Sequence, residues 1–189
     1  KSRLALALAK LLRTLEAQLV AYRTRIQEVF NQHPDKDWFG SLPFPPEGKT
    51  GPRLLAELGT DRERFGDAQA LQCQAGTAPV RFQSGQYEKA YLRRACNKHF
   101  RFAIHWFADL SRAKCPWAAT YYQHKRTAGK THACALRCLG HRWLKIIWKM
   151  WQTKTPYNAD LHQQNQLKHG SWVLQLMTSA TKAQTLVTP

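Results

Sequence analysis

One long helix is predicted at the start of the chain, over Ser2–Phe30, because apolar residues recur there every three, four or seven positions. The positions that define this pattern are Leu4, Leu8, Leu11, Leu12, Leu15, Leu19, Tyr22, Ile26 and Val29. The apolar stripe would pack either on the chain's own domain or on a second helix, which would make residues 1–30 a coiled-coil-like arm.

A proline-rich stretch follows this helix. Residues 31–49 include His33-Pro34-Asp35 and Leu42-Pro43-Phe44-Pro45-Pro46. Proline stops helices and stiffens the chain, so we expect a linker between the arm and a globular domain.

A compact helical domain is expected over residues 50–157. Pro52 suits the first turn of a helix that Gly59 can end, and Asp67 can cap the next one. The predicted helices are Arg53–Leu58, Ala68–Cys73, Tyr87–Arg112, a segment from Pro116 through Tyr121, and Ala133–Trp151. No segment alternates long enough to predict a strand, so the fold class is mainly α, with a long N-terminal helix before the compact domain.

The segment before Tyr87 is predicted as a serine-bearing loop. Gly76–Val80 and Gln83–Gly85 have turn-forming sequences, with at most a short extended piece between them. The helix expected after it has apolar residues at three- and four-residue steps, namely Leu92, Ala95, His99, Phe102 and Trp106. Apolar density falls after Pro156, so residues 158–189 are expected to form a C-terminal tail.

Charge restricts the partners of the chain. Lys and Arg total 29 against 12 Asp and Glu, which gives a formal net charge of +17 and a pI near 10.1. Such an excess favours a polyanionic partner, DNA or RNA first and an anionic membrane surface second. No apolar run is long enough to span a bilayer, no signal peptide is recognisable, and five cysteines without a regular framework suit a reducing cytosol. The first residue is Lys1, so we expect a piece of a longer polypeptide.

Ser84 precedes Gly85 in the predicted loop and stands just ahead of a basic segment. The cations around it are Arg81, Lys89, Arg93, Arg94, Lys98 and Arg101. Arginine binds phosphate oxygens bidentately, and a helix N-terminus offers free N–H groups to the same anion. A serine held there can attack a phosphodiester. Alternatively, Ser84-Gly85 is a plain turn and the arginines form a solvated face that grips phosphates.

Residues 54–157 resemble the C-terminal, serine-bearing transposase domain of the insertion-sequence transposases that also have a RuvC-like DEDD domain, the bridge-RNA-guided recombinases. The matching pieces are Leu54–Gly59, Arg64-Phe65, Gly76–Val80, Ser84-Gly85, the spaced Arg94, Asn97 and Arg101, Tyr121-Tyr122, Arg126, Gly129-Lys130, Ala135–Arg137 and Trp143-Leu144. The stretch Leu42–Gly48 departs from the family's Leu-Pro-Gly-x-Gly hairpin, so a phosphate clamp is not expected there.

The resemblance implies that Ser84 is the nucleophile for DNA strand cleavage and exchange. It implies that Arg94, Asn97 and Arg101 orient the scissile phosphate, with Arg81 and Lys89 as outer contacts. It also implies DNA and a guide RNA as partners, oligomerisation through a coiled coil, and a bacterial, cytoplasmic, nucleoid-associated protein. Mg²⁺ would be held by the RuvC-like domain, which this chain lacks, so no cofactor and no metal site is expected here.

Other residues invite functional readings as well. Cys134, Cys138 and His141 share a helical face, but three ligands on one helix cannot complete a tetrahedral zinc site, so buried thiols are expected. Lys125, Arg126 and Lys130 surround Gly129 and form either a second phosphate-binding patch or a solvated loop.

The tryptophans are either core residues or surfaces on which bases stack. Helical spacing favours the core for most of them, with Trp148 and Trp151, which lie among lysines, as exceptions. Two other functions remain open at this point: a non-catalytic module that binds nucleic acid and dimerises through Ser2–Phe30, and a basic membrane-associated scaffold.

Overall fold

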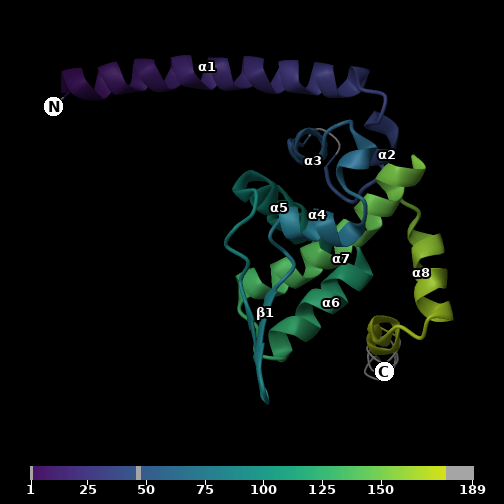
Figure 1. Cartoon of the computed structure of the whole chain (residues 1–189). Helices are drawn as coiled ribbons and strands as arrows, with labels where there is room; N and C mark the ends of the chain where they lie inside the picture. Colours follow the sequence, from purple (N-terminus) through teal and green to yellow (C-terminus); the bar gives the residue numbers. More distant parts are fainter. Residues whose placement is uncertain (1, 46–47, 178–189) are drawn as a thin grey trace, which may run out of the picture.

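The computed structural model describes residues 2–45 and 48–177, which form a helical body with two projections (Figure 1). The helices are α1 (Ser2–Gln32), α2 (Lys36–Gly40), α3 (Thr50–Leu58), a 3₁₀ turn (Arg62–Arg64), α4 (Ala68–Gln74), α5 (Lys98–Lys114), α6 (Pro116–Thr127), α7 (His132–Thr153) and α8 (Ala159–Lys168). The strands are β1 (Val80–Ser84) and β2 (Tyr87–Tyr91). The mainly α class with a long N-terminal helix is confirmed.

Helix α7 runs through the middle of the body and packs against α4, α5 and α6. At its centre Trp143 is fully buried, with ring centroids 4.7 Å from Trp117 and 5.0 Å from Phe107. The indole N–H donates to Ser111 Oγ at 2.9 Å. A buried tryptophan N–H usually has a partner, and this bond supplies it for Trp143.

Local end signals fix most helix boundaries. The Asp67 side chain accepts from Ala70 N, and the Gly59 N–H donates to Leu55 O with a positive φ of 77°, so both predicted caps are confirmed. Pro116 begins α6 as predicted, and Thr131 caps α7. These signals act within one turn, which is why the sequence alone reveals them.

The proline-rich stretch contributes to the core as well as connecting. It includes α2, and Trp38, Phe39, Leu42 and Phe44 are all buried. Residues 46–47 of the departing Leu42–Gly48 motif lie outside the described residues. At the other end, α8 and a short helix at 172–177 occupy the expected tail, and Val173 is buried against the body. The rest of that tail, 178–189, lies outside the described residues.

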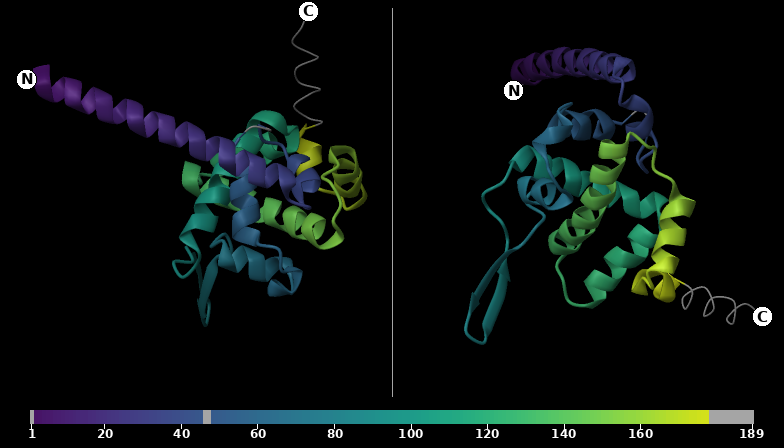
Figure 2. Two further views of the ribbon diagram at one scale, coloured as in Figure 1. Left: turned by 90° about the horizontal axis from the view of Figure 1, so that it is seen from above. Right: turned by 45° about the vertical axis from the view of Figure 1, so that its right-hand side comes forward.

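Helix α1 leaves the body at one end, and the β1–β2 hairpin leaves it at the other (Figures 1 and 2). Among the α1 residues that the structure describes, only Phe30 is buried, and the apolar stripe of the helix is exposed along its length. No helix among the described residues is long and apolar enough to cross a bilayer.

The structure corrects the helix predicted over Tyr87–Arg112. Residues 87–91 form the second strand of a hairpin, and the helix begins only at Lys98. Gly85, with φ of 56°, and Gln86 make a two-residue connection of the kind that joins tight antiparallel pairs. Glu88 and Lys89 are adjacent in β2, so this strand lacks the strict alternation of apolar and polar residues that would predict it from sequence.

The predicted inward face of that helix is also wrong. Helix α5 buries Phe100, Ala103, Ile104, Phe107, Ala108 and Ser111. Phe102 and Trp106, expected on the apolar side, are each 55% exposed. Trp151, expected to be a surface tryptophan, is fully buried, and Trp148 is partly buried and donates to Phe65 O. Two apolar stripes run along α5, and contacts with α3 and α7 decide which one faces inward.

Candidate nucleic-acid interface: the serine hairpin

Ser84 is the last residue of β1 and pairs with Tyr87 at the tip of the hairpin. It is exposed, and it does not lie directly ahead of a helix, contrary to the prediction. The N-terminus of α5 lies at Asn97, near the hairpin base, so its free N–H groups are not beside Ser84. The serine is instead carried away from the body on a two-stranded ribbon (Figures 1 and 2).

The pairing divides the hairpin into two unlike faces, because side chains alternate along a strand and paired residues share a face. One face carries Val80, Phe82, Ser84, Tyr87, Lys89 and Tyr91. The other carries Arg81, Gln83, Glu88 and Ala90. All ten strand residues are exposed. Ser84 therefore sits at the end of an aromatic face, and the opposite face is polar.

Lys89 is the predicted cation that shares the face of Ser84. It pairs with Phe82, and its Nζ lies 5.5 Å from the centre of the Tyr91 ring. The rings of Phe82 and Tyr87 meet edge to face with centroids 6.4 Å apart. Arg81 lies on the other face, where its guanidinium is 3.5 Å from Glu88. Both groups are exposed, so this ion pair is weak and leaves Arg81 available to a phosphate.

The base of the hairpin is held by residues predicted to bind the phosphate. Asn97 caps α5 by accepting from His99 N and Phe100 N, and its Nδ2 donates to Glu57 at 2.7 Å. Its own backbone N–H donates to Gln74 O at 2.8 Å. Asn97 thus connects the segment between β2 and α5 to both α3 and α4.

Arg101 makes the second anchor. Its guanidinium donates to Arg93 O and to Cys96 Sγ, and the Arg93 side chain in turn reaches Ala78 O at 3.4 Å. Gly76, with φ of 64°, lies against this guanidinium: a Cβ there would come within 2.5 Å of Arg101 Nη2. Both chain segments that enter the hairpin are therefore packed around one arginine.

The other predicted cations are open to solvent. Arg94 and Lys98 are exposed beside the hairpin base. The turn between α6 and α7 points toward the same end of the molecule as the hairpin (Figure 1), and there Arg126 donates to Lys130 O at 2.8 Å. Lys125 lies over the rings of Tyr121 and Trp172. The structure thus brings Arg93, Asn97 and Arg101 together and distributes the other cations over the hairpin and this turn.

Sequence reasoning missed two partners of these anchors, Glu57 and Gly76. Both belong to motifs that carried the family resemblance, but neither had a role assigned to it. Their contacts join residues far apart in sequence, as in the Asn97–Glu57 hydrogen bond, so local pattern could not reveal them.

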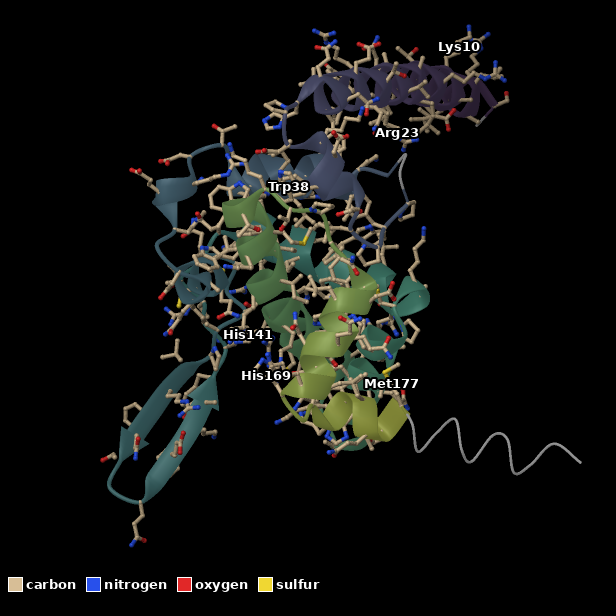
Figure 3. All side chains as sticks on the ribbon, turned by 90° about the vertical axis from the view of Figure 1, so that its right-hand side faces the viewer. Lys10, Arg23, Trp38, His141, His169 and Met177 are labelled. Atoms are coloured by element: carbon tan, nitrogen blue, oxygen red, sulfur yellow. The ribbon has the colours of Figure 1, made fainter. Side chains whose placement is uncertain are left out.

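Two aspartates outside the hairpin, Asp35 and Asp61, have partners within the protein. Asp35 is buried and pairs with Arg62 at 2.7 Å, and Asp61 accepts from Glu63 N. Within the described ranges, no group of three or more potential ligands is placed to hold a metal ion. The five cysteines are free thiols, and burial raises the pKa of Cys138. His141, marked in Figure 3, lies 3.4 Å from Thr77 Oγ1, and burial lowers its pKa.

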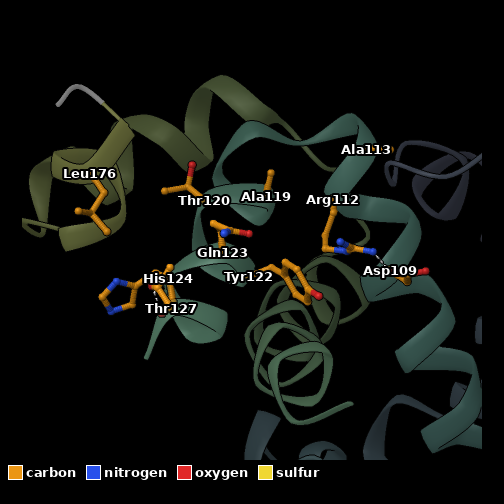
Figure 4. Close-up of a pocket in the computed structure, with 10 residues that line it drawn as sticks. All are labelled: Asp109, Arg112, Ala113, Ala119, Thr120, Tyr122, Gln123, His124, Thr127 and Leu176. Atoms are coloured by element: carbon orange, nitrogen blue, oxygen red, sulfur yellow. Dashed lines mark hydrogen bonds and ion pairs between the residues drawn. The ribbon is translucent and has the colours of Figure 1, made fainter. Parts of the chain in front are cut away.

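A cavity of about 700 Å³ lies away from the hairpin, between the end of α5 and α6, with Leu176 at its edge (Figure 4). Arg112 dominates it, paired with Asp109 and held 4.1 Å from the centre of the Tyr122 ring. Its cation is therefore neutralised within the cavity wall, which leaves little charge to attract a phosphate.

Residues 47–123 match the family described as Transposase IS116/IS110/IS902. This part of the chain is therefore similar to a transposase domain of the IS110/IS116/IS902 type. The matched segment includes α3, the whole hairpin and all of α5, so it contains Ser84 and its anchors.

Curated relatives align beyond this segment. The protein named as the mini-circle transposase for IS117, from Streptomyces coelicolor, is 34% identical over 80% of the chain. The 42 kDa protein of insertion element IS900, from Mycobacterium paratuberculosis, is 31% identical over 80% of the chain. The alignments cover 37% and 38% of those proteins, so the chain spans well under half the length of the curated relatives it matches.

Proposed function

We propose that this chain is the C-terminal part of a bacterial insertion-sequence transposase that binds DNA and supplies Ser84 as the nucleophile for strand cleavage and exchange. One observation carries the proposal: within a transposase-family segment, an exposed serine lies at the tip of a hairpin that projects from a strongly basic body. A hydroxyl in that position can reach a phosphodiester without moving the core. The two-stranded ribbon is also an element that fits a DNA groove.

The proposed step is a transesterification. Ser84 Oγ forms a bond to the phosphorus as its proton passes to a base, the bond from the phosphorus to one sugar oxygen breaks, and that oxygen takes up a proton and leaves as a hydroxyl. The new phosphoserine ester conserves the phosphoester bond, so a second strand can be joined by the reverse exchange. Phosphoryl transfer depends mainly on positioning and charge stabilisation, which suits a nucleophile on an anchored arm.

The cations around the hairpin take two roles in this proposal. Lys89, Arg81, Arg94 and Lys98 are exposed and contact DNA phosphates, with Lys125, Arg126 and Lys130 as a second patch. Asn97, Arg93 and Arg101 act mainly by holding the base of the hairpin, because each donates a side-chain hydrogen bond within the protein. The guanidinium of Arg101 adds positive charge at the base of the hairpin.

The remaining partners are also proposals. A guide RNA would bind the same basic body, and Mg²⁺ would come from a RuvC-like domain outside this chain. The exposed apolar stripe of α1 supports pairing with a second copy, since such a stripe on a long helix is stable in water when another helix covers it. Acting on chromosomal DNA places the protein in the bacterial cytoplasm, at the nucleoid.

The test uses the longer transposase that contains this domain. Incubation with its DNA, followed by denaturation, should yield a covalent protein–DNA species whose linkage maps to Ser84. Ser84→Ala should abolish it. Gln83→Ala, on the opposite face of the same hairpin, is the matched control and should retain it. A covalent species that persists in Ser84→Ala would disprove the nucleophile assignment.

A second candidate is a non-catalytic module that binds nucleic acid and dimerises. The continuous exposed stripe on α1 together with the net charge favours it independently of Ser84. It predicts that Ser84→Ala recombines as well as the unsubstituted protein, while truncation of α1 abolishes function. The adduct experiment therefore separates the two candidates.

A further inference from the structure

The outward face of α5 carries two large aromatic side chains that the core does not use. Phe102 and Trp106 are each 55% exposed, their ring planes differ by 10°, and their centroids are 6.4 Å apart. They lie one turn apart and so share a helical face. Two parallel rings left in water form a surface that a ligand with flat apolar faces would cover.

These rings form one wall of a groove of about 460 Å³ between α5 and the start of α3. The lining also includes Lys49 and Arg53 at the start of α3, together with Pro45 and Leu110. The Arg53 guanidinium lies over the Phe102 ring, 4.6 Å from its centre. The groove therefore combines two aromatic rings with two cations.

The charges at the groove indicate what covers it. Lys49 and Arg53 are exposed, and Lys98 lies one turn before Phe102 on the same face of α5. None of the described residues that line the groove is acidic. An apolar protein segment laid there would leave the cations at the rim without counterions, whereas a nucleic-acid strand brings one phosphate with each base.

The geometry also restricts the form of the nucleic acid. Exposed aromatic rings can stack only on bases that are free of a duplex, because paired bases present their edges in the grooves. We propose that this surface, the α5 platform (Lys49, Arg53, Lys98, Phe102 and Trp106), binds an unpaired stretch of nucleic acid, with bases on the two rings and phosphates on the three cations.

The α5 platform does not depend on the chemistry of Ser84. Lys98 is the one side chain that contributes a phosphate contact both beside the hairpin and on the α5 platform, so the variants that test the platform change only Phe102 and Trp106. An unpaired strand arises either as displaced DNA or as a loop of RNA, and both present the same stacked bases between phosphates.

The test is binding of short fluorescent oligonucleotides to the full chain at about 0.3 M salt, where purely electrostatic binding is weak. We expect oligo(dT) or oligo(U) to bind and to quench tryptophan fluorescence. Trp106→Leu with Phe102→Leu should reduce single-strand affinity roughly ten-fold or more, since leucine keeps the apolar area but not the stacking. Trp106→Phe should retain most of the binding. Preference for oligo(dT) or oligo(U) identifies the source of the strand.

The controls follow from the structure. Leu161→Ala removes an equally exposed apolar side chain on α8 and should bind as the unsubstituted chain does. Ser84→Ala should also bind normally, so that failure of the serine proposal and failure of this one can be told apart. Circular dichroism checks that each variant is folded, as we expect for substitutions at exposed positions.

Three results would overturn the proposal. The first is unchanged single-strand affinity in the double leucine variant. The second is an equal loss of duplex binding, which would mean that the effect is not on unpaired bases. The third is loss of self-association without loss of oligonucleotide binding, which would make the groove a protein contact.

Discussion

The helical body and the hairpin differ in what holds them. Around α7 the largest side chains are buried, as Trp143 is between Phe107 and Trp117, and α7 packs against α4, α5 and α6. Along the hairpin all ten strand residues are exposed, and the fold secures only the base. An isolated two-stranded hairpin is marginal in water. Packing in the body therefore provides most of the stability of the fold. The exposed hairpin residues contribute little to it and are available to contact a partner.

The largest expected effect is in the body. Trp143→Ala should lower the free energy of unfolding by about 3–5 kcal/mol, because it leaves a large cavity and removes the indole N–H that donates to the Ser111 hydroxyl. Urea denaturation followed by circular dichroism measures it. A loss below about 1 kcal/mol would mean that the body does not depend on this packing.

The next effect is at the junction of the two regions. Asn97→Ala removes the cap of α5 and the bond to Glu57, and should cost about 1–2 kcal/mol. Hydrogen exchange of the hairpin amides should rise more than that of α7. Asn97→Ser is the matched control: it keeps a capping oxygen, so it should recover α5 while the contact with Glu57 stays lost. Equal exchange in the hairpin of both variants and the parent would exclude the anchoring role.

A pH effect should be confined to the body. Burial lowers the pKa of His105, His141 and His162 below the usual value of 6.5. The unfolded chain therefore takes up protons first, so stability should be full above pH 6.5 and fall as the pH drops below it. Thermal unfolding between pH 7.5 and pH 5, as approximate limits, tests this. Replacing His162 by Gln should flatten the curve in part, and an unaltered slope would contradict its contribution.

The smallest effect on stability is expected in the hairpin. Phe82→Ala removes a side chain that is 56% exposed and should change the free energy of unfolding by about 0.5 kcal/mol or less. DNA binding should weaken if the aromatic face contacts nucleic acid. A destabilisation as large as that of Trp143→Ala would erase the difference between the two regions.

The helical architecture was predictable because its signals are local. Asp67, Gly59 and Pro116 mark helix ends through contacts within one turn, and α7 shows one apolar stripe. The hairpin was not predictable, because Glu88, Lys89 and Ala90 suit a helix as well as a strand and only pairing with β1 decides. Trp106 was predicted to be buried and is exposed, whereas Trp151 was predicted to be exposed and is buried. Residues far away in sequence, such as Arg62 and Phe65, cover Trp151.

The site was predictable in composition but not in arrangement. Ser84 and the basic residues that follow it are visible in the sequence, and Lys89 does share the face of the serine. The sequence does not show that Asn97 and Arg101 contact the protein itself. Their partners Glu57, Gln74 and Gly76 lie in other segments of the chain. Sequence spacing describes one element at a time, and this junction joins several.

The length of α1 makes it sensitive to small changes in a way that the body is not. Its 31 residues form a rod of about 46 Å, at about 1.5 Å per residue. Deleting one residue near its middle would swing Leu4 and Leu8 through about 100° around the rod axis, while deleting seven would return them to within about 20°. The rotation of α1 about its axis, more than its length, therefore decides which way its apolar stripe faces relative to the hairpin that carries Ser84.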